Sequence, residues 1–242
     1  MLQKTEIKIG ELDCILVKSE SCKNPKAAVL FCHGFGAPGT DLVGLADVII
    51  KIGQAQQNAV YVFPAAPIEL DPLLDSRAWW MIDIEKIQNL MMKGETREMQ
   101  GESPDLLPQR RIELTYVIDH FRDEFSLPAS KVVIGGFSQG SMLATDVALH
   151  YPESLGALIV WSGALINSDQ WTLQAHRQSP LTIFQSHGTV DPILPIDGAR
   201  NLKAMLESKN HQVEYVEFNG PHTIPMNAVK LAGQLIGKVV NK

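Results

Sequence analysis

The segment at residues 131–144, KVVIGGFSQGSMLA, constrains the fold of this chain more than any other. A β-branched apolar run leads into Gly136 and Phe137, and a helix-forming segment begins directly after Ser138. Glycines lie two positions on either side of the serine, where a tight turn from strand to helix leaves no room for side chains. The pattern predicts a nucleophile elbow, which exposes the Ser138 hydroxyl above the edge of a sheet. A surface serine in a glycine-rich turn is the alternative, but the flanking strand and helix favour the elbow.

The same turn and a second glycine-rich loop predict a site for a developing negative charge. The backbone N–H of Gln139 lies at the N-terminus of the predicted helix, where the helix dipole favours an anion. The apolar strand at 27–32 leads into a loop at 33–39 with three glycines, whose backbone can approach a ligand closely. We expect the N–H groups of Phe35 and Gln139 to form an oxyanion hole together. The phosphate-binding patterns G-x-G-x-x-G and G-x-x-x-x-G-K-[ST] are absent, which argues against a nucleotide site.

A serine hydroxyl is a weak nucleophile at neutral pH, so the elbow requires a histidine base and a carboxylate that orients it. In this kind of fold the chain order is Ser, then Asp or Glu, then His. Asp191 follows the strand expected at 181–186, on a loop at the sheet edge where α/β proteins place their sites. His222 follows the strand expected at 213–218 in the same way. The alternative role for Asp191 is that of a turn or helix-capping residue before Pro192.

Six other histidines compete with His222 for the role of base. His33 and His187 each precede a glycine at the end of a strand, and we favour a structural or loop-ordering role for both. Only His222 follows both Ser138 and Asp191 in the required order. The remaining four lie on predicted helices, helix ends or polar loops: His120, His150, His176 and His211.

Strands and helices alternate from residue 27 onward, which predicts the α/β class with a mostly parallel sheet covered on both faces. Strands at 5–9 and 13–18 are expected to form an antiparallel N-terminal hairpin. The whole chain, 1–242, has an ordinary length for one α/β domain, with a cap-like insertion at about 64–106 punctuated by prolines. The other expected strands are 27–32, 59–63, 131–135, 156–161, 181–186 and 213–218, and the expected helices are 41–52, 107–125, 139–150, 196–209 and 224–240.

Composition limits the partners of this chain. The formal net charge is −6, and no basic run is longer than Arg110-Arg111, which argues against nucleic acids and anionic membranes. No stretch approaches about 18 apolar residues, so no stable membrane insertion is expected, and the N-terminal segment lacks the apolar core of a signal peptide. Cys14, Cys22 and Cys32 lack zinc-site spacing and indicate reduced thiols in a cytoplasmic protein, with no metal.

Six sequence blocks, in the same order along the chain, carry a resemblance to a known family. They are FCHGFGAPGTDL, FPAAP at 63–67, SRAWW at 76–80, GGFSQGSMLA, SHGTVDPILP at 186–195 and GPHTIP at 220–225. The chain resembles the phospholipase/carboxylesterase family of α/β hydrolases, which includes acyl-protein thioesterases. This resemblance implies the α/β-hydrolase fold and cofactor-free hydrolysis of carboxylic esters or thioesters. It further implies a triad and an oxyanion hole made by Ser138, Asp191, His222, Phe35 and Gln139.

The chain departs from the family in two places. The segment between Trp80 and Leu114 is longer than in short members, and Pro221 and Thr223 flank the histidine where smaller residues are more common. The longer segment leaves the substrate class open: a small ester, a lysophospholipid or a protein thioester.

Large apolar side chains near that segment suggest an acyl-binding wall. For Trp79 and Trp80 in the SRAWW block we favour a substrate-binding role over simple packing. For Met91 and Met92 the two roles stay open. Two alternatives to hydrolysis also stay open: acyl transfer to an acceptor other than water, and a binding protein without catalysis on the same scaffold.

Overall fold

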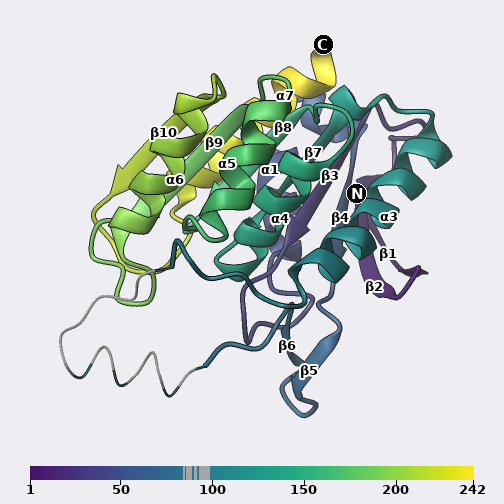
Figure 1. Cartoon of the computed structure of the whole chain (residues 1–242). Helices are drawn as coiled ribbons and strands as arrows, with labels where there is room; N and C mark the ends of the chain where they lie inside the picture. The colour runs from purple at the N-terminus through teal and green to yellow at the C-terminus, as the bar shows by residue number, and fades with distance from the viewer. Residues whose placement is uncertain (84, 86–88, 90–91, 93–98) are drawn as a thin grey trace.

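The computed structural model describes residues 1–83, 85, 89, 92 and 99–242, and a large sheet lies at its centre (Figure 1). Its strands are β1 (Leu2–Ile9), β2 (Leu12–Ser19), β3 (Ala27–Cys32), β4 (Ala59–Pro64), β7 (Val132–Phe137), β8 (Ala157–Trp161), β9 (Thr182–Gly188) and β10 (Gln212–Phe218). Across the sheet they follow the order β1-β2-β4-β3-β7-β8-β9-β10. The pairs β1–β2 and β2–β4 are antiparallel, and every other neighbouring pair is parallel.

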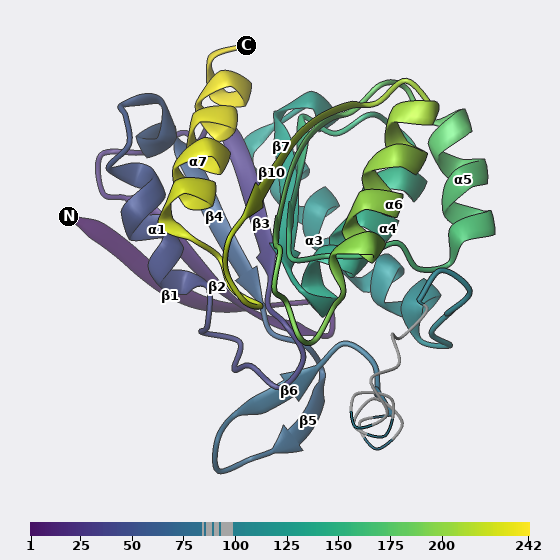
Figure 2. The ribbon, with the colours of Figure 1, turned by 90° about the vertical axis from the view of Figure 1, so that its left-hand side faces the viewer.

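Helices cover both faces of the sheet. Their bounds are α1 (Val43–Ile50), α3 (Leu107–Phe125), α4 (Gln139–His150), α5 (Ser168–Arg177), α6 (Ile196–Ser208) and α7 (Met226–Asn241), with short 3₁₀ turns η1 (Ala55–Asn58) and η2 (Ala129–Lys131). Figure 2 shows α1 and α7 on one face, and α3, α4, α5 and α6 on the other. Among the described residues, no helix is both long and apolar enough to cross a membrane.

The central strands are apolar on both sides because each side packs against helices. In β3, Leu30 belongs to the buried cluster under α3 and α4, whereas its neighbour Phe31 belongs to the cluster under α1 and α7. Alternate residues of a strand point to opposite faces, so a strand buried on both faces is apolar throughout. Burial of these two layers is the main stabilising contribution to the fold.

The predicted α/β architecture is confirmed. The N-terminal hairpin pairs antiparallel, and the strands and helices expected from residue 27 onward occur within a few residues of their predicted bounds. The helix α5 was not expected from the sequence, because its ten residues are mostly polar and only Trp171 and Ala175 are buried.

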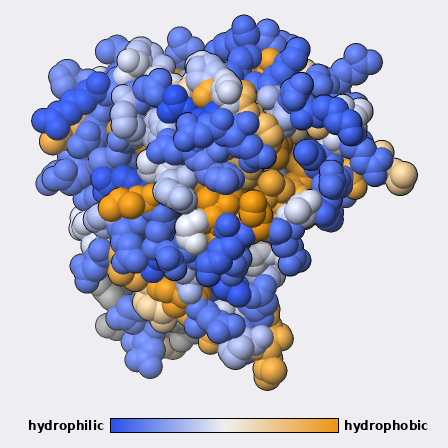
Figure 3. Space-filling view, turned by 90° about the vertical axis from the view of Figure 1, so that its right-hand side faces the viewer, coloured by the Kyte–Doolittle hydropathy of each residue, from blue (hydrophilic) through white to orange (hydrophobic). Residues whose placement is uncertain are grey.

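The 64–106 segment contains a small hairpin that the sequence did not predict. It is formed by β5 (Ile68–Asp71) and β6 (Ser76–Ala78), which pair antiparallel with a register shift. The hairpin is the lowest part of the molecule in Figure 3, where hydrophobic side chains are exposed, and its turn carries the exposed Leu73 and Leu74. Met92 is exposed, whereas Met91 lies outside the described residues. The cap-like role of this segment stays a prediction.

Candidate active site

Ser138 occupies a strained turn between the end of β7 and the start of α4. Its backbone angles are φ 53° and ψ −121°, an uncommon conformation for a residue other than glycine. A Cβ atom on Gly136 would lie 2.5 Å from the carbonyl oxygen of Cys32, and one on Gly140 would lie 2.1 Å from the same atom. Both glycines are therefore required because the backbone of β3 passes directly beside the turn. The strand–turn–helix geometry that the sequence predicts for a nucleophile elbow is present.

Hydrogen bonds from neighbouring elements hold this strained residue in place. The Ser138 N–H donates to the carbonyl of Trp161 at the end of β8, at 2.9 Å. The Ser141 hydroxyl donates to the Ser138 carbonyl at 2.7 Å. A strained backbone of this kind costs on the order of 1–3 kcal/mol and persists only where its surroundings fix it. The fold therefore maintains this backbone conformation of the serine.

Two backbone N–H groups, one on the loop that contacts the elbow and one on the elbow itself, have no hydrogen-bond partner among the described residues. A Cβ atom on Gly34 would lie 3.4 Å from the Ser138 Cβ, so the loop after β3 contacts the elbow. Within the described residues, no hydrogen bond engages the N–H of Phe35 or of Gln139. The loop itself is fixed, because Gly36 N–H donates to the Arg77 carbonyl at 2.8 Å. These are the two donors that the sequence assigned to an oxyanion hole.

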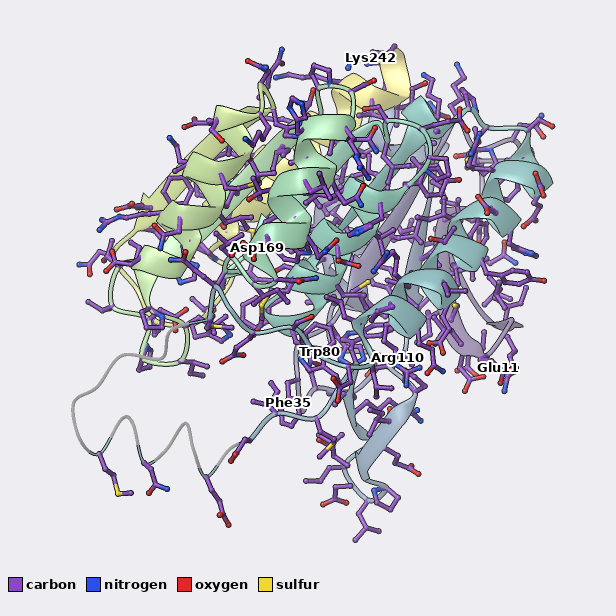
Figure 4. All side chains as sticks on the ribbon, in the orientation of Figure 1. Glu11, Phe35, Trp80, Arg110, Asp169 and Lys242 are labelled. Atoms are coloured by element: carbon purple, nitrogen blue, oxygen red, sulfur yellow. The ribbon has the colours of Figure 1, made fainter. Side chains whose placement is uncertain are left out.

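The side chain of Gln139 has a structural role that sequence reasoning missed. Its Oε1 accepts from the Trp79 N–H at 2.9 Å, and its Nε2 donates to the Trp80 carbonyl at 2.8 Å. The Trp79 indole in turn donates to the His33 carbonyl at 2.9 Å. The SRAWW block therefore joins the elbow to the loop after β3. Figure 4 shows Phe35 and Trp80 at the same lower edge of the sheet, near Arg110.

Trp79 and Trp80 lie largely inside the protein. Trp79 is fully buried and Trp80 is 7% exposed, and both belong to the core cluster on the α3 and α4 side. Arg110 donates to the Trp79 carbonyl at 2.9 Å, which fixes this part of the chain to α3. A substrate-binding role for the two indoles stays a prediction.

His33 has the loop-ordering contacts expected from the sequence. Its ring is buried, its Nδ1 lies 2.9 Å from the Gly34 carbonyl oxygen, and its Nε2 accepts from the Ala66 N–H at 3.0 Å. Since Nε2 accepts a hydrogen bond, Nδ1 carries the hydrogen and donates. Burial lowers the pKa of His33, although its hydrogen bond to Gly34 opposes this shift. His33 is therefore a neutral residue that orders the loop after β3.

Asp191 and His222 form the shortest side-chain contact of the site. His222 Nδ1 lies 2.6 Å from Asp191 Oδ2, and the Asp191 side chain is fully buried. The other carboxylate oxygen accepts from the N–H groups of Ile193 at 2.8 Å and Leu194 at 2.9 Å. Burial raises the pKa of Asp191, but hydrogen bonds from His187, His222 and Leu194 outweigh it and hold the pKa well below its usual range. Asp191 is therefore an ionised carboxylate at neutral pH.

The loops that carry Asp191 and His222 are fixed to each other. Thr189 N–H donates to the Phe218 carbonyl at 2.8 Å, and Val190 N–H donates to the Gly220 carbonyl at 3.2 Å. A Cβ atom on Gly188 would lie 2.3 Å from that Gly220 oxygen, so only glycine fits there. These contacts explain why both loops end at one place on the sheet edge.

His222 also lies against the elbow. Its ring centroid is 4.7 Å from that of Phe137, the residue before Ser138. Ser138, Asp191 and His222 thus follow the carboxyl ends of three parallel strands, β7, β9 and β10, as the sequence predicted for their positions. Within the described residues, no group of three or more His, Cys, Asp or Glu side chains is arranged to hold a metal ion.

The sequence model of the family described as Phospholipase/Carboxylesterase matches residues 13–240, nearly the whole chain. The chain belongs to the phospholipase/carboxylesterase family. Two curated relatives support this assignment. Acyl-protein thioesterase 1 of Eremothecium gossypii is 29% identical over 82% of both chains. Acyl-protein thioesterase 1 homolog 1 of Dictyostelium discoideum is 25% identical over 89% of this chain and 92% of its own. The resemblance found in the sequence is confirmed.

Solved structures share the fold of this phospholipase/carboxylesterase family member. Esterase PE8 matches with a TM-score of 0.71 at 21% identity, covering 93% of this chain and 97% of its own. The carboxylesterase of Bacillus cereus matches with a TM-score of 0.67 at 20% identity, covering 95% of both chains. These similarities confirm the predicted α/β-hydrolase fold.

Proposed function

We propose that this chain is a serine hydrolase that cleaves carboxylic esters or thioesters through an acyl-serine intermediate. The observation that carries the proposal is the 2.6 Å contact between Asp191 and His222 beside the strained elbow at Ser138. Family membership and the thioesterase names of the curated relatives support the same chemistry.

In the proposed first step, Ser138 is the nucleophile and His222 is the general base. His222 Nδ1–H donates to ionised Asp191, which leaves Nε2 free to accept the proton of the Ser138 hydroxyl. The serine oxygen attacks the carbonyl carbon of the substrate, and a tetrahedral oxyanion forms. His222 then donates its proton to the leaving alcohol or thiol, and an acyl-serine remains.

The unpaired N–H groups of Phe35 and Gln139 would stabilise the oxyanion. Donors fixed in place before the reaction stabilise a developing charge without reorganisation, and one such donor contributes about 3–4 kcal/mol in well-studied hydrolases. In the second step, a water molecule takes the place of the leaving group. His222 accepts a proton from this water as its oxygen attacks the acyl-serine. The same cycle then releases the carboxylic acid and restores Ser138.

The proposed substrate carries an acyl group. The surface near the SRAWW block would determine which acyl chain lengths the protein accepts. We propose that Trp80, at the edge of the elbow, contacts the acyl chain, whereas Trp79 supports the site from inside the core. This division rests on the 7% exposure of Trp80 and on the complete burial of Trp79.

Covalent labelling with a fluorophosphonate probe, together with hydrolysis of a p-nitrophenyl ester and a matched thioester, tests the proposal. The wild-type protein should react with the probe and hydrolyse both compounds, and Ser138→Ala should do neither. Ser179→Ala, at an exposed serine outside the site, should behave as the wild type. A folded wild-type protein that the probe does not label would instead support a binding protein on a hydrolase scaffold. Labelling by the probe without hydrolysis of the ester would support acyl transfer if an added alcohol or thiol then restored turnover of the ester.

A further inference from the structure

A second histidine contacts the carboxylate of the Asp191–His222 pair. His187 lies at the end of β9, four residues before Asp191, and its side chain is fully buried. Its Nε2 lies 2.8 Å from the Leu194 carbonyl oxygen and 3.3 Å from Asp191 Oδ2. The Asp191 carboxylate is therefore surrounded by nitrogen atoms on both oxygens, with His187 and His222 sharing Oδ2.

The neighbours of His187 fix its tautomer. Both atoms near Nε2, a main-chain carbonyl oxygen and a carboxylate oxygen, only accept hydrogen bonds, so Nε2 carries the hydrogen. The other ring nitrogen, Nδ1, is buried and has no hydrogen-bond partner within the described residues. All hydrogen bonding by this ring is therefore directed at Asp191 and at the Leu194 peptide.

The Leu194 peptide connects the two contacts. Its carbonyl accepts from His187, and its N–H donates to Asp191 Oδ1 at 2.9 Å. His187 thus orients the carboxylate by two routes, directly at Oδ2 and through the Leu194 peptide at Oδ1. A buried imidazole that only filled space would not require this pair of acceptors.

Resting on the proposed function above, we infer that His187 is a positioning residue for the Asp191 carboxylate. It holds the carboxylate in the plane that His222 requires, and it shares the negative charge that would otherwise act on His222 alone. The hydrogen-bonded state of Asp191, which lowers the pKa of that residue, agrees with this role. No bond forms or breaks at His187.

Few other charged groups face this pair within the described residues. Glu217 of β10 is in register with His187, but its carboxylate binds Arg200 of α6 at 2.8 and 2.9 Å. On the other side of β9, the last residue of β8, Trp161, is paired with Ser186, the residue before His187, and carries no charge. Changes in acid–base behaviour on substitution of His187 should therefore arise from Asp191 and His222.

Two substitutions of His187 by amide residues distinguish the effect of the Nε2 contact from the effect of having any polar side chain at this position. The amide nitrogen of Gln can occupy the place of histidine Nε2, whereas that of Asn is one atom shorter and reaches only the place of Nδ1. His187→Gln should keep the contact and His187→Asn should lose it. His211→Gln and His211→Asn are matched controls, because His211 is also buried and its Nε2 lies 3.0 Å from a carbonyl oxygen, that of Ala175, away from the site.

The experiment measures kcat and KM for a p-nitrophenyl ester from pH 4.5 to 9, normalised to the fraction labelled by fluorophosphonate. His187→Asn should lower kcat about tenfold with little change in KM, because a misplaced catalytic group slows the chemical step. The acid limb of its pH–rate profile should also move, because the Asp191 carboxylate that contacts His222 loses one of its two histidine contacts. His187→Gln should retain most of the wild-type kcat and keep the acid limb close to its wild-type position. Both His211 variants should leave the position of the acid limb unchanged.

An unmoved acid limb in His187→Asn, or an equal shift in its His211 control, would overturn the inference. If His187→Asn does not fold, His187→Phe removes the same donor with an apolar ring, and the same limb is measured. In an Asp191→Asn background the His187 substitutions should no longer move the limb. Absence of hydrolysis by the wild-type protein would contradict the proposed function itself, which distinguishes that failure from failure of this inference.

Discussion

The two sides of the candidate site are held in place by different kinds of interaction. On the oxyanion side, the loop at Phe35 and the N-terminus of α4 are joined by neutral hydrogen bonds through Gln139, Trp79 and His33. On the acid–base side, Asp191 is an ionised carboxylate bonded to main-chain N–H groups and contacted by two histidines. The contacts on the oxyanion side should therefore be insensitive to pH, whereas those on the acid–base side should depend on it. Substitutions on each side test this division.

The largest effect should come from the groups that act directly on the substrate. Ser138→Ala and His222→Ala should each reduce kcat by about 10⁶-fold, and the double variant should be little worse, because the two groups act as one unit. Asp191→Asn should cost less, about 10⁴-fold. Single-turnover hydrolysis of an activated ester, with circular dichroism as a control for folding, measures these losses. Retention of more than a few per cent of activity by folded Ser138→Ala would exclude the mechanism.

Local sequence signals were sufficient to predict the elbow and the order of the candidate triad. The glycines around Ser138 and the strand-to-helix pattern are encoded within about ten residues, so no tertiary information was needed. The loops at Asp191 and His222 follow predicted strands, and strand ends meet at one edge of a parallel sheet. These features follow from patterns of neighbouring residues, which can be recognised without knowledge of the tertiary structure.

The contacts made by Gln139 and His187 could not be predicted in the same way. The Gln139 side chain binds a backbone segment about 60 residues earlier in the chain, and no local pattern signals such a partner. For His187 only a structural or loop-ordering role could be expected, because the order of the triad excluded it as the base. The α5 helix was missed because its residues are mostly polar, and tertiary packing of Trp171 sets its position.

Substitution of Gln139 should damage the oxyanion side alone. Gln139→Ala keeps the backbone N–H but leaves the Trp79 N–H and the Trp80 carbonyl without their partner. We expect a loss of about 10²-fold in kcat, comparable to removal of one oxyanion donor, with the acid limb of the pH profile unmoved.

Gln56→Ala is the matched control for this variant. Gln56 is also buried and donates to a main-chain carbonyl, that of Gly233 at 2.7 Å, away from the site. It should lower the unfolding temperature without changing kcat. A shifted acid limb in Gln139→Ala would show that the two sides are not independent.

A smaller effect is expected at the acyl-binding surface. Trp80→Ala should raise KM about tenfold for an eight-carbon ester, because apolar contact with the acyl chain is lost, while a two-carbon ester is hardly affected. Kinetics on both esters, after circular dichroism confirms folding, make the comparison. Equal losses on both chain lengths would mean that Trp80 serves only to pack the core and to bind Gln139.

The smallest effect should appear in the pH dependence of stability. The pKa of Asp191 is lower in the folded protein than the ordinary value of about 3.9, so its contribution to stability is fully present above that value. The contribution is lost as the pH falls below about 4 toward the folded-state pKa. Urea unfolding from pH 6 to pH 3 should therefore show a steeper loss of stability in the wild type than in Asp191→Asn. Parallel curves would argue against an ionised, hydrogen-bonded carboxylate.

Detection of the acyl-serine intermediate tests the central claim most directly. The protein is mixed with an excess of p-nitrophenyl octanoate, quenched in acid within milliseconds to seconds, digested and analysed by mass spectrometry. The account predicts one octanoyl group on the peptide that contains Ser138, formed and lost at rates consistent with turnover, and absent from Ser138→Ala. Turnover without an adduct, or an octanoyl group carried by another residue at those rates, would contradict it.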